Sequence, residues 1–140
     1  MKVLTFKRGI HPPDEKNQTK HKEIKEIMPK VGEKLIYPMI QHIGAPCKPI
    51  VKIGDRVLVG TKIAESDAFV SSPIHSSISG IVKTFKKTFT PTGITCDSIV
   101  IENDGEMEES PEMVPNENYF DFSKEEILKK IKEAGIVGLG

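Results

Sequence analysis

The sequence predicts a small, mostly β domain, built as a barrel or a sandwich and followed by one helix. Apolar stretches of three to six residues are separated by turn-forming residues, and Gly and Pro together make up 21 of the 140 residues. Short strands at this spacing are typical of small barrels and sandwiches. The pattern changes after residue 105, where an acidic stretch containing two prolines leads to a helical segment.

Seven short apolar segments carry the strand pattern. Pro38 indicates a sheet edge or a bulge, because proline lacks the backbone N–H that a central strand donates. Residues 14–34 are polar and lysine-rich, and we interpret them as a surface arm or loop with at most one helical turn. The expected strands, in chain order, are residues 3–6, 34–40, 50–53, 57–59, 61–64, 81–85 and 97–102.

Five residues are assigned a structural role in turns. Glycine and aspartate let the chain reverse within a few residues, because glycine adopts φ above zero and aspartate bonds to nearby backbone. Between the turns, apolar and polar side chains alternate, and we expect the apolar set to point into the core. The turn residues are Gly44, Gly54, Asp55, Gly60 and Gly80, and the inward set is Val51, Ile53, Val57, Val59 and Ile63.

A helix after residue 122 is predicted by signals at both of its ends. Ser123 is the expected N-cap, and Glu126, three residues later, completes a capping box. Phe122 and Ile127 take the positions of a hydrophobic staple, and Gly135 supplies the C-terminal cap. The apolar face of this helix comprises Ile127, Leu128, Ile131 and Ala134.

These changes of composition divide the chain into three parts. Residues 1–105 form the β domain with its N-terminal arm, residues 106–118 form an acidic linker, and residues 119–140 form the helix and the start of another domain. The last part ends in a glycine-rich phrase that is too short to cradle a phosphate, so no complete cofactor-binding set is assigned. We therefore expect a fragment or a truncated reading frame. The glycines of this phrase are Gly135, Gly138 and Gly140.

The charge distribution narrows the classes of partner. The formal net charge is zero, but residues 1–64 hold 13 Lys or Arg against 6 Asp or Glu, and residues 102–126 hold 10 acidic residues against one lysine. The lysines of the basic half are scattered without aromatic side chains between them, so we predict a solvated face and no nucleic-acid partner. No apolar run approaches the ~20 residues that span a bilayer, so we expect no direct membrane insertion.

Thiol and imidazole groups give weak signs of a site. Cys47 and Cys96 are 49 residues apart without a C-x-x-C pair, which fits neither a metal site nor a disulfide scaffold. A low-pKa thiol at Cys47 competes with the favoured alternative of an inert cysteine in a turn. A zinc site formed by His11, His42 and His75 competes with the favoured interpretation that each imidazole bonds to nearby backbone.

No catalytic residue is assigned from the sequence. Ser76, Ser77 and Ser79 lie close to His75 along the chain, but no acid that could orient the imidazole is evident. A Ser–His pair without such an acid is a poor basis for a hydrolase.

Residues 51–65 resemble the first half of a biotinyl/lipoyl carrier domain, and residues 72–83 resemble the returning strand of its second half. That family folds as a flattened barrel, the barrel-sandwich hybrid, whose halves are related by a pseudo-two-fold axis. Carrier domains hold a modified lysine, typically flanked by methionines, at the tip of the hairpin that joins the halves. Residues 65–70 contain neither lysine nor methionine, so we predict no carrier activity.

A wider resemblance rests on five segments, which are residues 6–13, 41–46, 54–57, 72–80 and 101–105. In this order and spacing they resemble the N-terminal region of RnfC, the peripheral subunit of the Rnf electron-transport complex. The resemblance resumes at the helix and at residues 135–140. Arg8 departs from the family pattern, in which we expect a second glycine before Gly9.

The RnfC resemblance implies a complex that transfers electrons between NADH and ferredoxin and couples this transfer to ion movement. In that family a domain that handles FMN and NADH, a β-grasp segment and two 4Fe-4S cluster motifs follow this module. We expect none of these cofactors here, since the chain lacks closely spaced cysteines. The implied partners are the other Rnf subunits and the remainder of the RnfC-like protein. The implied location is cytoplasmic, at the inner face of the cell membrane.

We therefore predict a structural docking module that is not catalytic by itself. The turns at residues 41–46 and 75–80 are the first candidates for contacts with other subunits. The alternatives are a relative of the A subunit of the sodium-pumping NADH:quinone reductase, a reductase-associated relative, and a free-standing degenerate biotinyl/lipoyl-type binding module. The His-Pro-Pro sequence at residues 11–13 favours the RnfC-like assignment.

Overall fold

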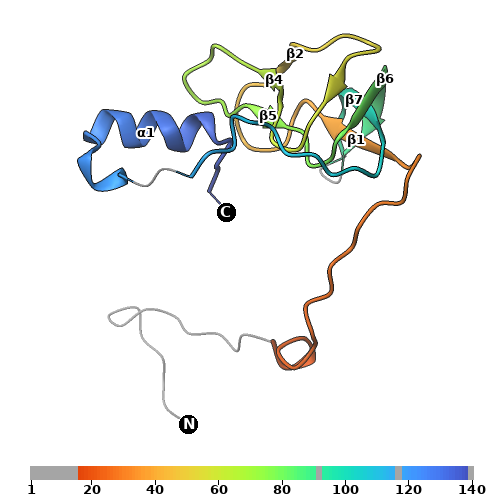
Figure 1. Ribbon diagram of the computed structural model, residues 1–140, viewed down its shortest axis with the longest axis horizontal. Coiled ribbons are helices and arrows are strands. Elements are labelled where there is room, and N and C mark those ends of the chain that lie inside the picture. The colour runs from red at the N-terminus through yellow and green to blue at the C-terminus, as the bar shows by residue number, and fades with distance from the viewer. Residues whose placement is uncertain (1–15, 91–92, 116–117, 139–140) are drawn as a thin grey trace.

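Two antiparallel sheets share one core in the computed structural model, which describes residues 16–90, 93–115 and 118–138 (Figure 1). The larger sheet has the strand order β1-β7-β6-β3, and the smaller has the order β2-β4-β5. The larger sheet comprises β1 (Lys34–Pro38), β3 (Arg56–Val57), β6 (Gly80–Phe89) and β7 (Thr95–Asn103). The smaller sheet comprises β2 (Lys48–Pro49), β4 (Lys62–Glu65) and β5 (Ile74–His75).

The core draws on strands of both sheets. Ile99 and Ile101 of β7 meet Ile63 of β4 there, and all three are fully buried. Aliphatic and β-branched side chains dominate, as the short alternating segments of the sequence require. The mostly β fold class is thus confirmed. The buried cluster comprises Tyr37, Met39, Cys47, Val57, Ile63, Ala64, Ile74, Ile78, Val82, Ile99 and Ile101.

Most of the expected strands are present with shifted ends. The segments predicted at 34–40, 61–64, 81–85 and 97–102 correspond to β1, β4, β6 and β7. β1 is an outer strand of its sheet and ends at Pro38, which confirms the edge position. β6 continues to Phe89 because it forms a long hairpin with β7. The strand expected at residues 3–6 lies outside the described residues.

The strand expected at residues 50–53 is wrong. The backbone N–H of Lys52 donates to Asp55 Oδ2 at 2.7 Å, and the N–H of Asp55 donates back to the carbonyl of Lys52 at 3.1 Å. These bonds, with Gly54 at φ 94°, close a turn that occupies residues 52–55. Ile53 is consequently 60% exposed and does not point inward as predicted. The strand lies earlier, at β2.

A close backbone approach at Gly80 joins three strands of the larger sheet. Gly80 pairs with Val57 on one side and with Asn103 on the other. A Cβ atom at this position would overlap the carbonyl oxygen of Glu102, so only glycine fits. The role predicted for Gly80 is structural, and the register explains it.

A polar cluster surrounds this approach, and we call it the corner. Ser79 is fully buried, and its hydroxyl donates to Asp104 Oδ1 and accepts from the backbone N–H of Glu108 at 3.2 Å. The Arg56 guanidinium lies 3.3 Å from Asp104 and 2.7 Å from Glu108. These contacts tie the end of β7 to the start of β6 and to β3.

The chain remains attached to the barrel beyond residue 105. The N–H of Val59 donates to the carbonyl of Glu108 at 2.9 Å, and the N–H of Ser110 donates to the carbonyl of Val59 at 2.8 Å. Val59 and Glu109 form a parallel bridge, and Met107 packs against the core. The start of the segment predicted as an acidic linker therefore contributes to the barrel. The division of the chain near residue 105 stays a prediction.

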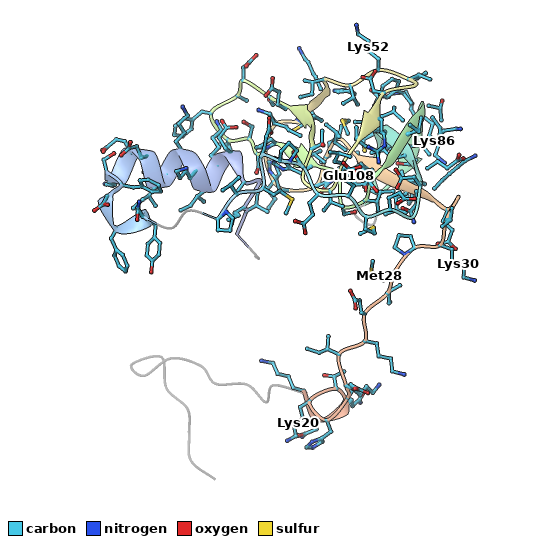
Figure 2. The ribbon with its side chains drawn as sticks, in the orientation of Figure 1. Lys20, Met28, Lys30, Lys52, Lys86 and Glu108 are labelled. Carbon is cyan, nitrogen blue, oxygen red and sulfur yellow. The ribbon has the colours of Figure 1, made fainter. Side chains whose placement is uncertain are left out.

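The lysine-rich arm extends away from the barrel (Figures 1 and 2). It contains a single 3₁₀ turn, Lys16–Gln18, and Ile24 is 97% exposed. Its base is fixed by Asn103, whose Nδ2 donates to the carbonyls of Pro29 and Lys30 at 3.0 and 3.1 Å. The prediction of a surface arm with one helical turn is confirmed.

The C-terminal helix α1 spans Lys124–Glu133 and follows a 3₁₀ turn at Tyr119–Asp121. The capping box is confirmed, because the N–H of Glu126 donates to Ser123 Oγ at 3.3 Å and the N–H of Ser123 donates to Glu126 Oε2 at 2.8 Å. Gly135, at φ 73°, follows the C-cap residue. Among the described residues, no helix has the length and apolar character needed to cross a membrane.

Two contacts hold the C-terminal end of α1 against the smaller sheet. Lys62 Nζ lies 3.4 Å from a carboxylate oxygen of Glu133. Gly135 lies so close to β5 that an added Cβ would be 2.9 Å from the carbonyl oxygen of Pro73 and 3.1 Å from His75 Nδ1. The helix is therefore placed beside the barrel (Figure 1).

Replacing Gly80 by alanine tests the close approach at the centre of the larger sheet. We expect Gly80→Ala to lower the free energy of unfolding by about 1–3 kcal/mol or more, because β6 and β7 must separate to admit the methyl group. Urea denaturation measures this change. The matched control is Gly138→Ala, where an added Cβ meets nothing within 4 Å. Equal stability of the two variants would contradict the proposed packing.

Replacing Asp104 by asparagine tests the corner. The hydrogen bond from Ser79, assisted by the N–H of Glu106 and by Arg56, holds the pKa of Asp104 below its ordinary value of 3.8. A lowered pKa in the folded state stabilises the fold above the unfolded pKa, and this stabilisation is lost as the pH falls through the folded value.

We therefore expect Asp104→Asn to be less stable than the wild type at pH 7, with the difference shrinking as the pH falls below 3.8. Urea denaturation from pH 7 to pH 3 measures this difference. Asp67→Asn removes an exposed carboxylate from another loop and controls for net charge. A difference that stays constant with pH would argue against an ionised Asp104 in the corner.

Candidate docking surface

The loop between β4 and β5 occupies the place of the carrier hairpin and is held by its own backbone. The Ser71 hydroxyl bonds to the carbonyl oxygens of Ser66, at 3.0 Å, and Ala68. These bonds close the loop and leave Phe69 97% exposed. Because residues 65–70 contain no lysine, the loop presents apolar surface and no amine for a covalent cofactor.

The histidines considered for zinc have different surroundings. His42 packs under Gly44, where an added Cβ would lie 2.6 Å from its Cε1 atom. His75 lies beside Gly135, and burial, followed by the charge of Lys62, lowers its pKa. In the described part of the chain, no group of three or more His, Cys, Asp or Glu residues could hold a metal ion. His11 lies outside the described residues.

Both cysteines are buried free thiols. Cys47 Sγ donates to the carbonyl oxygen of Ser72 at 3.1 Å. Burial, with a further contribution from the negative charge of Glu65, raises the pKa of Cys47. A raised pKa keeps the thiol protonated, which opposes the hypothesis of a reactive thiolate.

The three serines of residues 76–79 make structural hydrogen bonds. Ser76 Oγ donates to the carbonyl of Ile78 at 2.7 Å, Ser77 Oγ lies 2.9 Å from the hydroxyl of Tyr37, and Ser79 belongs to the corner. Most of this segment is buried. The turn at 75–80, one of the two predicted contact turns, therefore offers little surface to a partner.

The other predicted turn, at residues 41–46, borders a large apolar groove between the barrel and α1. We call it the α1 groove, and its volume is about 660 Å³. One wall comes from the loops at 41–43 and 69–72, and the other comes from α1 and residues 136–138. The lining residues are Gln41, His42, Ile43, Phe69, Val70, Ser71, Ser72, Leu128, Ile131, Lys132, Ile136, Val137 and Gly138.

A second apolar hollow, of about 720 Å³, shares residues 41–43 with the α1 groove. It is lined by the end of β1 and by the tip of the β6–β7 hairpin, where Ile94 is 52% exposed. Ile43 belongs to both hollows and is fully exposed. The remaining lining residues of this second hollow are Pro38, Ile40, Gly44 and Thr90.

Together the two hollows form one apolar surface, which we call the docking surface. Apolar surface of this extent on a folded domain is characteristic of an interaction site. Phe69 was not predicted as a member, although an apolar pair at 69–70 between two strands was a visible signal. The turn at 41–46 and the apolar face of α1 were both predicted, but the loop at 69–72 was not.

The chain matches the family model described as the RnfC barrel sandwich hybrid domain over residues 4–106. It is 43% identical over 136 residues to the C subunit of the Na(+)-translocating ferredoxin:NAD(+) oxidoreductase complex of Acetobacterium woodii, covering 97% of this chain and 30% of that protein. It is 44% identical over 138 residues to the proton-translocating counterpart of Clostridium ljungdahlii, covering 99% and 30%.

A third relative, the C subunit of the ion-translocating oxidoreductase complex of Haemophilus influenzae, is 32% identical over 141 residues, covering 99% of this chain and 21% of that protein. The chain thus spans less than a third of the length of these curated relatives. The family model covers most of the chain and agrees with the two-sheet barrel described above. The expected resemblance is confirmed, and the chain belongs to the family of RnfC barrel-sandwich hybrid domains.

Proposed function

We propose that this chain is the N-terminal docking module of an RnfC-like subunit. The subunit would belong to a membrane-associated complex that transfers electrons between NADH and ferredoxin and moves ions. Two of the relatives named above support this proposal, because they are the C subunits of ferredoxin:NAD(+) oxidoreductase complexes. The module would sit at the cytoplasmic face of the membrane and be held there by partner subunits.

The docking surface is the observation that carries the proposed role. It exposes Ile43 completely and Phe69 almost completely on a domain whose own core is already closed. Exposed apolar side chains on rigid loops favour a protein contact, because their removal from water contributes about 25 cal/mol per Å². The loop in place of the carrier hairpin contributes to this surface, so the barrel acts as a support for other domains.

The residues of this chain do not fit the cofactors that the family implies. A four-iron cluster needs four thiolates, whereas this chain has two cysteines, and both are buried. We therefore assign FMN, NADH and both 4Fe-4S clusters to the remainder of the longer protein. The helix would connect the barrel to that part.

The alternatives make different demands on the same surface. A relative of the A subunit of the quinone reductase would use the barrel in the same way within another complex. A free-standing biotinyl/lipoyl-type module would function without a further domain. The exposed apolar face of α1 favours a role within a larger complex over a free-standing module, since such a face is stabilised by contact with another domain.

A chimera tests the proposed function. This chain replaces the matching 30% of the Acetobacterium woodii relative, and the chimera is expressed with the other subunits of that complex. We expect the chimera to enter the complex and to support reduction of NAD(+) by ferredoxin in isolated membranes. A folded chimera that stays outside the complex would contradict the docking role.

The purified chain provides the second measurement. We expect its intact mass to equal the sequence mass and its absorption spectrum to show neither flavin nor iron–sulfur bands. A covalent adduct, or bound flavin or iron, would contradict the assignment of a module without cofactors.

A further inference from the structure

The α1 groove is a composite site, because its two walls come from parts of the chain that are distant in sequence. Phe69 stands on the loop between β4 and β5, and Leu128 stands on α1. The second wall is positioned by the Lys62–Glu133 ion pair and by the close packing of Gly135 on β5. The groove therefore exists only while α1 is held beside the barrel.

Both walls are apolar and uncovered. Phe69 is 97% exposed, Leu128 56% and Ile136 62%. Lys132 is the one charged side chain among the described residues that line the groove. An occupant that fits this site is itself mostly apolar.

A buried hydroxyl adds one polar feature to the barrel wall. Ser72 is 5% exposed, and its Oγ atom has no hydrogen-bond partner among the described residues. Unpaired buried polar atoms are rare in folded proteins and cost free energy, so a partner group is expected for this one.

The matches to other proteins indicate which occupant the groove takes. The barrel family model ends at residue 106 and so includes one wall only. The matches to the longer relatives cover 97–99% of this chain and so include both walls. The segments that form both walls thus align with proteins that are more than three times as long as this chain.

We propose that the α1 groove binds an apolar segment from the part of the RnfC-like polypeptide that this chain does not span. This inference rests on the proposed function and specifies which surface is contacted by the rest of that polypeptide. The segment inserts apolar side chains between Phe69 and Leu128. The second hollow of the docking surface remains accessible to other subunits.

The test uses the chimera with a specific protease site inserted directly after Gly140. After cleavage, gel filtration shows whether the two pieces stay together. We expect the wild-type pieces to remain associated. In the Phe69→Asp and the Leu128→Asp variants, the two pieces are expected to bind each other more weakly by a factor of about ten or more. The matched controls, Phe89→Asp and Ile24→Asp, change exposed apolar residues outside the groove and are expected to bind like the wild type.

The outcomes separate this inference from the proposed function. Pieces that stay together equally well in all four variants would overturn the groove assignment and leave the docking function intact. Wild-type pieces that separate on cleavage would overturn the inference, whereas an uncleaved chimera that stays outside the complex would contradict the docking function. A dimer of the isolated chain that is lost in Phe69→Asp would overturn the inference in favour of a second copy as the occupant.

Hydrogen exchange locates the contact independently of any substitution. We expect slower amide exchange at residues 69–72 and 128–137 in the intact chimera than in the isolated chain. Slower exchange confined to the faces of β6 and β7 would overturn the inference.

Gly135→Ala tests the placement of α1 without changing a residue that lines the groove. At φ 73° and with the carbonyl of Pro73 only 2.9 Å from the added Cβ, alanine forces the helix away from β5. We expect weaker association of the cleaved pieces, with an unchanged unfolding transition of the barrel. Wild-type association in this variant would show that the position of α1 is irrelevant to binding, which contradicts a composite groove.

Discussion

The structure depends on the close backbone approach of Gly80 to Glu102. This approach places β6 between β3 and β7, and a side chain at residue 80 would prevent it. The buried hydroxyl of Ser79 then reaches Asp104, and Arg56 completes the corner. From the adjacent Asn103, hydrogen bonds hold the base of the arm, while residues 108–110 bond to Val59. A single contact thus organises the sheet, the arm and the segment beyond the barrel.

The burial of two potentially reactive side chains and the exposure of apolar loops both follow from the way the barrel packs. Two groups that could react are buried and hydrogen-bonded. The Cys47 thiol, whose pKa is raised, donates to the carbonyl oxygen of Ser72, and the Ser79 hydroxyl bonds to Asp104 in the corner. What the barrel leaves exposed near the carrier-hairpin position is apolar surface centred on Ile43 and Phe69. In the proposed role, a fold that elsewhere carries a covalent cofactor on a lysine serves as a support for other domains.

The sequence predictions were correct where the local pattern and the structure agree, and wrong where a single contact outweighed the pattern. The capping box of α1 was predictable because Ser123 and Glu126 are three residues apart and satisfy each other locally. β6 was predictable from alternation along the strand, and β7 from the apolar run at residues 99–101. The strand at 50–53 failed because one side-chain bond, from the Lys52 N–H to Asp55, outweighed the apolar character of Ile53. The burial of the turn at 75–80 also escaped prediction, since tertiary packing alone determines it.

The sequence by itself determined the fold class, the helix ends and the lack of a modifiable lysine at 65–70, because these depend on residue identity and local spacing. Only the tertiary structure decided where the docking surface lies. Phe69 and Leu128 belong to separate elements and become opposite walls only when Gly135 packs on β5 and Lys62 pairs with Glu133. Contacts between distant segments leave no periodic signal in the chain, since they are specified by the packing of the whole domain.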